Sequence, residues 1–282
     1  MLTNRWLVLL IAVLLLAGCS RRRVQRADVT VDLLLPMTPV KNQGKSELCW
    51  AYAMLATIET EHLVRGDSVN LSAVYVGRML RDVRGKMDDV RRKTEEGKNE
   101  KDTKWQRAMG QTLLNIIQRY GIVGYDVLPD DATDDLPTPH HVFMLGMEYT
   151  PLEFAHSVCA PGEYVSLTSI PDSPYYRKVE VPVPDNWEHN RLLNIPLDTL
   201  RHRVSRALDN HHPVCWESSG HAMAIVGKAH DKRGRKYYIL KNSWGTGDDN
   251  DGMVYMPASR LWRDMVALYM THDAYDGVAA VK

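Results

Sequence analysis

The chain has 282 residues with 35 basic and 35 acidic side chains, so its formal net charge is zero. A balanced chain of ordinary apolar content lacks the global field that attracts nucleic acid, and we expect no nucleic-acid partner. The length suits one large domain or two medium ones.

The N-terminus has the pattern of a targeting segment. Arg5 supplies a positive charge, and the apolar run over residues 6–16 has the length of a signal-peptide core but is short for a membrane span. The run ends in Leu-Ala-Gly-Cys at Cys19, which resembles the lipobox of bacterial lipoproteins. We therefore expect residues 1–18 to be a lipoprotein signal peptide, Cys19 to carry lipid, and residues 19–35 to form a tether.

This assignment predicts a location in the bacterial cell envelope, with the chain lipid-anchored to a membrane at the periplasmic face or the cell surface. An ordinary signal peptide or an uncleaved anchor is the alternative.

A polar turn at residues 41–46 leads into a helix predicted over 46–63, with Ser46 as its N-cap. Cys49 falls in the first turn of this helix. A thiol there feels the positive end of the helix dipole, which favours the nucleophilic thiolate. Taken alone, Cys49 is better explained as a small buried apolar residue, because free cysteines are among the most buried residue types.

Two more helices are predicted in the first half of the chain. One begins after Ser72 as its N-cap, and the other covers residues 109–120, with Gly121 as its stop. Between them, residues 81–104 carry many charges of both signs. That mixture predicts a solvated helix or a surface loop rather than a binding patch.

The second half of the chain has β character. After a proline-rich connector we expect a short helix near residues 151–158 and an amphipathic helix over 197–210. The predicted strands are 164–168, 178–183, 213–217, 222–226, 236–241 and 253–256. This order of elements predicts an α+β protein with two lobes, a helical lobe over 36–150 and a β-rich lobe over 151–282.

Candidates for thiol chemistry come from the second half. A nucleophilic thiol needs a base, a group that orients the base, and donors for the oxyanion. His221 opens a small, apolar strand, where a polar side chain calls for a partner. Asn242 ends another strand and can bond an imidazole, and Trp244 can shield that bond from water. Each alone has a plainer explanation, because the chain has 11 histidines and Asn-Ser is common in turns.

Together, Gln43, Cys49, His221 and Asn242 resemble the papain-like cysteine peptidases in order and local motif. His221 lies in Gly-His-Ala-Met, and Asn242 lies in Lys-Asn-Ser-Trp-Gly. The stretches 42–46, 164–168, 173–176 and 220–223 look more narrowly like the aminopeptidase C and bleomycin hydrolase branch, and the resemblance runs through most of residues 36–270.

The resemblance implies a papain-like, two-lobed fold with the active site between a helical lobe and a barrel-like β-rich lobe. It also implies a peptide or protein substrate and no cofactor or metal. In the implied mechanism, the Cys49 thiolate, paired with protonated His221, attacks a peptide carbonyl. The Gln43 side chain and the Cys49 backbone N–H stabilise the oxyanion, and Asn242 orients His221 with Trp244 in support.

Several departures from the family pattern leave alternatives open. Ser46 stands where many members carry a disulfide cysteine, the cleft glycine pair is reduced near Gly110, and the chain between Pro213 and His221 is short. The alternatives are a catalytically silent papain-like lipoprotein used for binding and a cell-wall peptidase on a related fold.

The sequence leaves three further points open. Cys159 and Cys215 can form a disulfide or remain free. The sequence also does not separate endopeptidase from aminopeptidase action. We hypothesise that Glu47, two residues before the thiol, favours a substrate with a free amino terminus if its carboxylate points into the cleft.

Overall fold

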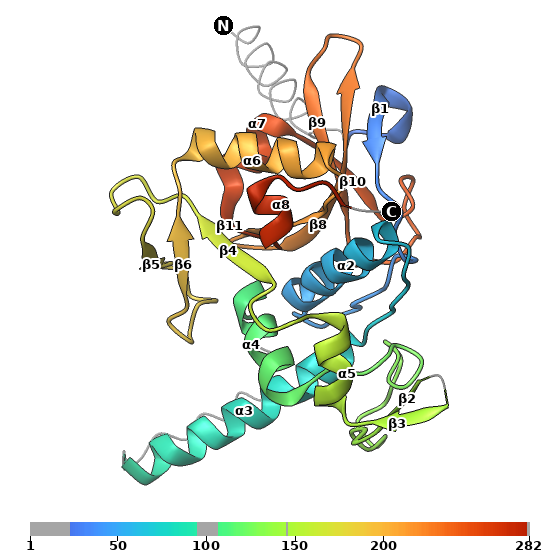
Figure 1. Cartoon of the computed structure of the whole chain (residues 1–282), viewed down its shortest axis with the longest axis vertical. Helices are drawn as coiled ribbons and strands as arrows, with labels where there is room; N and C mark the ends of the chain where they lie inside the picture. The colour runs from blue at the N-terminus through green and yellow to red at the C-terminus, as the bar shows by residue number, and fades with distance from the viewer. Residues whose placement is uncertain (1–22, 95–106, 145, 281–282) are drawn as a thin grey trace, which may run out of the picture.

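The computed structural model describes residues 23–94, 107–144 and 146–280. In the view of Figure 1, helices fill the lower part of the molecule and one large sheet fills the upper part. The predicted signal peptide and Cys19 lie outside the described residues. Of the helices in the described ranges, none has the length and apolarity to span a membrane.

Helix α2, Cys49–Val64, forms the centre of the helical part. Its residues from Cys49 to Glu61 are all buried, so it packs on every face. Helices α3 (Ala73–Thr94), α4 (Gly110–Tyr120) and α5 (Pro151–Val158) complete this part.

The capping of these helices matches the sequence prediction in one case and corrects it in the other. The N-cap of α2 is Leu48, and not Ser46 as predicted, because the Ser46 hydroxyl donates to the Gln43 carbonyl at 2.7 Å. The prediction for Ser72 is confirmed, since its hydroxyl accepts from the Tyr75 N–H at 3.0 Å at the start of α3.

In the described ranges, one nine-stranded sheet has the order β10-β9-β8-β7-β11-β4-β6-β5, and β1 pairs with β8. Neighbouring strands are antiparallel except β4 and β6. The strands are β1 (Val29–Leu34), β4 (Tyr164–Thr168), β5 (Lys178–Glu180), β6 (Arg191–Asn194), β7 (Val214–Ser218), β8 (Ala222–Asp231), β9 (Lys236–Lys241), β10 (Met253–Pro257) and β11 (Met265–Thr271). Three helices accompany the sheet: α6 (Leu197–Asp209), α7 (Ala258–Asp264) and α8 (His272–Asp276).

Most of the predicted elements are present, with changes of length. Strand β5 ends at Glu180, earlier than predicted, whereas β8 continues to Asp231 because β1 pairs with its second half. The structure places β1 within the segment that the sequence analysis assigned to a tether. The sequence analysis also missed β6, β11, α7, α8, the short 3-10 helix Arg26–Asp28 and a separate hairpin of β2 (Val142–Met144) and β3 (Met147–Tyr149).

The contact between α2 and the sheet positions the candidate site. Residues of α2 share one hydrophobic core with Cys215, Ala222 and Tyr269 from β7, β8 and β11. The N-terminus of α2 therefore meets the start of β8. Cys49, Cys159 and Cys215 are all buried free thiols. Cys159 and Cys215 therefore do not form a disulfide in this structure.

Candidate active site

Cys49 is the first residue of α2, at the helix end that packs on the sheet. The backbone N–H groups of Ala222 and Trp50 lie near the thiol and act to lower its pKa. Because Ala222 is the first residue of β8 and directly follows His221, the thiol lies beside the start of β8, next to the predicted base. The side chain of Cys49 is only 4% exposed.

His221, Asn242 and Trp244 form a connected group. The imidazole Nε2 lies 2.7 Å from the amide oxygen of Asn242, which also accepts the N–H of Ser243 at 2.9 Å. The indole of Trp244 stacks on the imidazole with 4.9 Å between ring centroids. Because an amide oxygen only accepts, Nε2 carries a proton, and Nδ1 is left to take the proton of the thiol.

Gln43 lies in the turn before α2 and is tied to the loop that carries Asn242. The Gln43 N–H donates to the Ser243 carbonyl at 2.8 Å, and the Ser243 hydroxyl donates to the Gln43 amide oxygen at 2.6 Å. The Gln43 amide nitrogen donates to the Ser46 carbonyl at 2.6 Å. An amide nitrogen has two hydrogens, so the second remains for an oxyanion.

A buried ionic network supports this loop, and the sequence analysis missed it. Glu59 of α2 is fully buried, pairs with Lys41, and accepts the Leu71 N–H at 2.8 Å. The ammonium of Lys241 donates to Thr38 at 2.8 Å, and burial lowers its pKa to about 8. Lys241 immediately precedes Asn242, so the network fixes the end of β9 from which Asn242 projects.

Arg107 is a second charged group that the sequence did not indicate. Its guanidinium donates to the Gly220 carbonyl at 2.6 Å and pairs with Asp185 at 3.1 Å. It therefore holds the residue before His221. The sequence gives little indication of this role, because Arg107 follows a segment rich in charges of both signs.

Glu217 lies under the site on β7 and is 3% exposed. Its carboxylate accepts the Tyr269 hydroxyl at 2.7 Å and the Gly110 N–H at 3.3 Å. Burial raises the pKa of Glu217 to about 7. A Cβ at position 110 would lie 2.7 Å from the Tyr269 ring, so this packing requires glycine there.

The titration directions at the site bear on the expected ion pair of Cys49 and His221. Burial raises the pKa of the Cys49 thiol, although the Arg107 charge and the N–H groups of Ala222 and Trp50 act in the opposite direction. Burial also lowers the pKa of His221, against its bond to Asn242. Both directions favour the neutral thiol and neutral imidazole over the expected ion pair, because desolvation penalises the charged forms.

The arrangement can support proton transfer from a thiol to an imidazole that an amide orients. Within the described ranges, no group of three or more His, Cys, Asp or Glu side chains could hold a metal ion. The structure brings the predicted Gln43, Cys49, His221, Asn242 and Trp244 to one place.

Comparisons with known proteins agree with this geometry. A family model described as papain family cysteine protease matches residues 206–267, the segment that contains His221 and Asn242. Ananain of Ananas comosus is 24% identical over 237 residues, 81% of this chain and 53% of its own. The chain thus spans about half the length of this curated relative.

Solved structures extend the comparison to the whole fold. PepW of Lactobacillus rhamnosis aligns with a TM-score of 0.66 at 16% identity, over 87% of this chain and 82% of that one. The fold is papain-like. Digestive procathepsin L 3 of the Tenebrio molitor larval midgut aligns with a TM-score of 0.50 at 17% identity, over 90% of this chain and 72% of that one. The family match and the relatives support the predicted cysteine peptidase, a hydrolase.

Proposed function

We propose that this chain hydrolyses peptide bonds through the thiol of Cys49 and the imidazole of His221, by way of an acyl-enzyme. The observation that carries the proposal is the 2.7 Å contact from His221 Nε2 to Asn242, which leaves Nδ1 free on the residue directly before Ala222, whose backbone N–H acts on the Cys49 thiol. The substrate is a peptide or protein.

The steps follow from the residues present. As the thiol attacks the carbonyl, its proton moves to His221 Nδ1, and the imidazolium is stabilised through Asn242. The second amide hydrogen of Gln43 and the Cys49 backbone N–H bind the oxyanion. His221 then protonates the leaving amine and later activates the water that releases the acyl group.

Active-site-directed alkylation tests the proposal. We expect a peptidyl epoxide or chloromethyl ketone to label Cys49 much faster than a free thiol, and Cys49→Ala to abolish both labelling and peptide cleavage. Both His221→Ala and Asn242→Ala should slow labelling and cleavage. Cys215→Ser serves as the control because that buried thiol is outside the mechanism. Labelling at the rate of a free thiol, unaffected by His221→Ala, would disprove the peptidase.

A catalytically silent protein is the second candidate, and two observations favour it. The Gln43 amide nitrogen is already bonded to the Ser46 carbonyl, and burial raises the pKa of the Cys49 thiol. That candidate predicts peptide binding without turnover in the same experiment. A cell-wall peptidase would instead release fragments from purified peptidoglycan.

Within the papain-like peptidases, we propose the aminopeptidase C and bleomycin hydrolase branch, on the motifs around Gln43 and His221. In that branch the C-terminal tail limits the cleft. Here the tail, as far as Ala280, packs at the other end of α2, where the His212 ring bonds the Val278 carbonyl at 2.9 Å and also bonds Glu61. Glu61 lies twelve positions after Cys49 in α2, about 18 Å along the helix axis. Cleavage mode therefore depends on groups nearer the thiol.

Glu47 is the group that we propose for substrate choice. It is exposed, and its charge contributes to the raised pKa of Asp185, which is caused first by burial. The Glu47 charge thus acts on Asp185, which pairs with Arg107, and the Arg107 charge in turn acts on the Cys49 thiol. We expect Glu47→Gln to reduce the preference for free over acetylated amino termini in a peptide library. Glu148→Gln, an exposed change on β3, should leave it as it is, and an unchanged preference in Glu47→Gln would refute the role.

For the location, we propose export to the bacterial cell envelope and lipid attachment at Cys19. The support is the sequence pattern of residues 1–19. Mass spectrometry of the N-terminal peptide from cells should find an acylated Cys19, and Cys19→Ser should shift the chain out of the membrane fraction. An unmodified Cys19 would exclude the anchor.

A further inference from the structure

The turn between β8 and β9 is an exposed, basic projection. Residues 232–236 are Lys-Arg-Gly-Arg-Lys, and all five are exposed. We call this segment the basic tip. In Figure 1 the hairpin extends beyond the rest of the sheet, next to β1. Four of its five residues are cationic, in a chain with no net charge.

Three of these cations have no ion-pair partner in the described part of the chain. Arg235 pairs with Asp231 at 2.6 Å, and Asp231 also accepts the Arg233 N–H at 2.9 Å. The side chains of Lys232, Arg233 and Lys236 have no such acidic neighbour. The basic tip therefore presents about three uncompensated positive charges to solvent.

A groove of about 860 Å³ continues from the basic tip along helices α6 and α7. We call it the basic groove. Its basic walls include Lys228, His230, Lys236, Arg201 and His202, and its floor includes the buried rings of Tyr238 and Trp262. Three of the basic groups are paired, His230 with Asp32 at 2.7 Å, Lys228 with Asp209, and Arg201 with Asp198 at 3.0 Å. The positive charge of Lys236 and the volume suit phosphate headgroups.

Strand β8 relates this surface to the candidate active site. The strand starts at Ala222, next to His221, and ends at Asp231, next to the basic tip. Ten residues of strand span about 30 Å. Val29 of β1 lies opposite Asp231, so the N-terminal segment, which includes Arg21 to Arg23 in sequence, joins the sheet at the basic tip. The candidate active site thus lies at one end of β8, and the basic tip lies at the other end.

We propose that the basic tip and the basic groove bind the headgroups of an anionic phospholipid bilayer. The charge complementarity and the arrival of the N-terminal segment at the same end of β8 favour a membrane over an acidic protein. Bound in this way, the molecule holds Cys49 about 30 Å from the lipid surface. This inference rests on the proposed peptidase activity. In this orientation the peptidase would act on substrates in the water phase, namely soluble peptides or water-exposed protein segments.

Hydrogen exchange of the full chain on vesicles tests this binding. One set of vesicles is phosphatidylcholine, and the other is an equal mixture of phosphatidylcholine and phosphatidylglycerol. We expect the backbone amides of residues 231–236 to exchange more slowly on the anionic vesicles only, and the protection to disappear in high salt. Equal exchange of these amides on both kinds of vesicle would overturn the proposal. This holds even if the N-terminus attaches the chain to both kinds of vesicle.

A charge-removal variant makes the test specific. Near an anionic surface each basic residue strengthens binding roughly fivefold, so Lys232→Gln, Arg233→Gln and Lys236→Gln together should weaken the preference for phosphatidylglycerol about 100-fold. Its matched control, Arg119→Gln, Arg177→Gln and Lys178→Gln, removes three exposed cations elsewhere and should retain that preference.

Two results contradict the proposal, and one control separates it from the peptidase. Equal loss in both triple variants would show general charge attraction. Binding of the basic tip to heparin but not to anionic vesicles would indicate an acidic macromolecule instead. Cleavage of a soluble peptide is measured in the same samples, and its absence in the wild-type chain would count against the peptidase while leaving the vesicle result intact.

Discussion

Arg107 acts on the candidate active site from a distance, through its charge and through the Gly220 carbonyl that it binds at 2.6 Å. Its positive charge favours the thiolate of Cys49 and disfavours the imidazolium of His221, so it lowers the pKa of both groups. In each case the effect of the Arg107 charge on the pKa is smaller than the effect of burial. It is therefore a tuning residue for the proton transfer.

We predict that Arg107→Met raises the pKa of both Cys49 and His221, because the loss of a positive charge favours the protonated form of each. Alkylation of Cys49 at neutral pH should slow about tenfold for each unit by which the thiol pKa rises. The pH profile of iodoacetamide labelling measures this.

Arg107→Lys keeps the charge and should retain most of the wild-type profile. Arg119→Met, an exposed arginine on α4, is the matched control. A profile that does not move in Arg107→Met would show that burial alone sets the thiol pKa.

At this scale the sequence predicts the reacting groups but not their tuning. Cys49, His221 and Asn242 lie in short motifs, so a local pattern indicates each of them. Arg107 and Glu217 have no local pattern, because their effect depends on tertiary contacts with Gly220 and Tyr269. Burial, which decides the direction of the thiol pKa, is also a tertiary property.

Helices α4 and α5 meet at Gly121, which ends α4 with a φ of +83°. A Cβ there would lie 2.1 Å from the Pro151 backbone. We predict that Gly121→Ala lowers the free energy of unfolding by at least ~3 kcal/mol, since it adds a backbone clash to the cost of a positive φ, about 1–3 kcal/mol. Urea denaturation measures the change.

Gly66→Ala isolates the strain from the clash. Gly66 has a φ of +86° but nothing within 4 Å of an added Cβ. This control should lose only the cost of a positive φ, about 1–3 kcal/mol. Equal losses in the two variants would show that the close approach of α5 is not what restricts position 121.

The buried contact between β7 and β11 gives the second prediction for an element. Burial raises the pKa of Glu217 from 4.5 to about 7, so the unfolded chain releases this proton at lower pH than the folded chain does. Stability should therefore fall as pH rises from about 4.5 to about 7, by on the order of 3 kcal/mol. Denaturation of Glu217→Gln across this range should lack that component.

Tyr269→Phe is the companion variant, because the Tyr269 hydroxyl donates to the ionised Glu217 at 2.7 Å. Its loss should raise the Glu217 pKa further and move the fall in stability to higher pH. If the wild type and Glu217→Gln show parallel pH dependence, Glu217 does not titrate in this range.

The helices and strands differ in how clearly the sequence predicts them. Helices α5 and α6 have a proline start or regular apolar spacing, and both were predicted. Strand β11 was missed because its apolar run follows α7 with no turn residue between them. The second half of β8 was missed because it depends on β1, a partner that is about 200 residues earlier in the chain.

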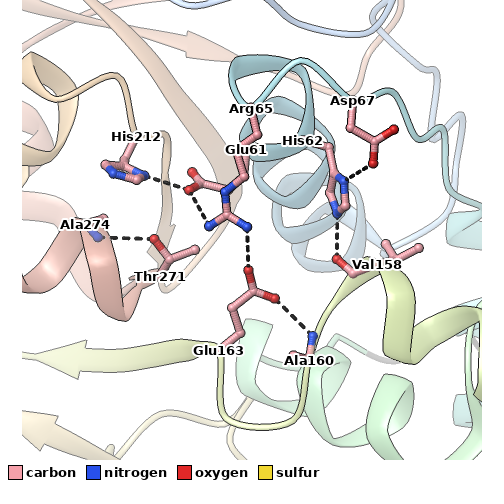
Figure 2. A network of polar contacts seen from close by, with 10 residues as sticks. All are labelled: Glu61, His62, Arg65, Asp67, Val158, Ala160, Glu163, His212, Thr271 and Ala274. Carbon is pink, nitrogen blue, oxygen red and sulfur yellow. Dashed lines mark hydrogen bonds and ion pairs between the residues drawn. The ribbon is translucent and has the colours of Figure 1, made fainter. Parts of the chain in front are cut away.

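Over the whole molecule, an ionic network joins segments that are far apart in the chain. Figure 2 shows His212 and Arg65 converging on Glu61 of α2, at 2.6 and 3.1 Å. Arg65 also donates to Glu163 at 3.1 Å, before β4. The other ring nitrogen of His212 bonds the Val278 carbonyl in the tail. The network thus connects α2, the start of β7, the approach to β4 and the C-terminal tail.

His212 makes this connection dependent on pH. Burial alone would lower the pKa of His212, but the hydrogen bond and charge of Glu61 outweigh burial and raise it above the ordinary 6.5. The folded chain therefore binds this proton more tightly than the unfolded chain. The added stability is complete below about pH 6.5 and is lost as pH rises through the folded-state pKa.

We predict that His212→Gln destabilises the chain more at about pH 6 than at about pH 9, because only the protonated ring forms an ion pair with Glu61. Chemical denaturation of variant and wild type at both values measures the difference. His202→Gln, an exposed histidine on α6, should show no such dependence. Equal destabilisation at both values would mean that His212 acts only through its two neutral hydrogen bonds. The connection among α2, the sheet and the tail would then be insensitive to proton binding at His212.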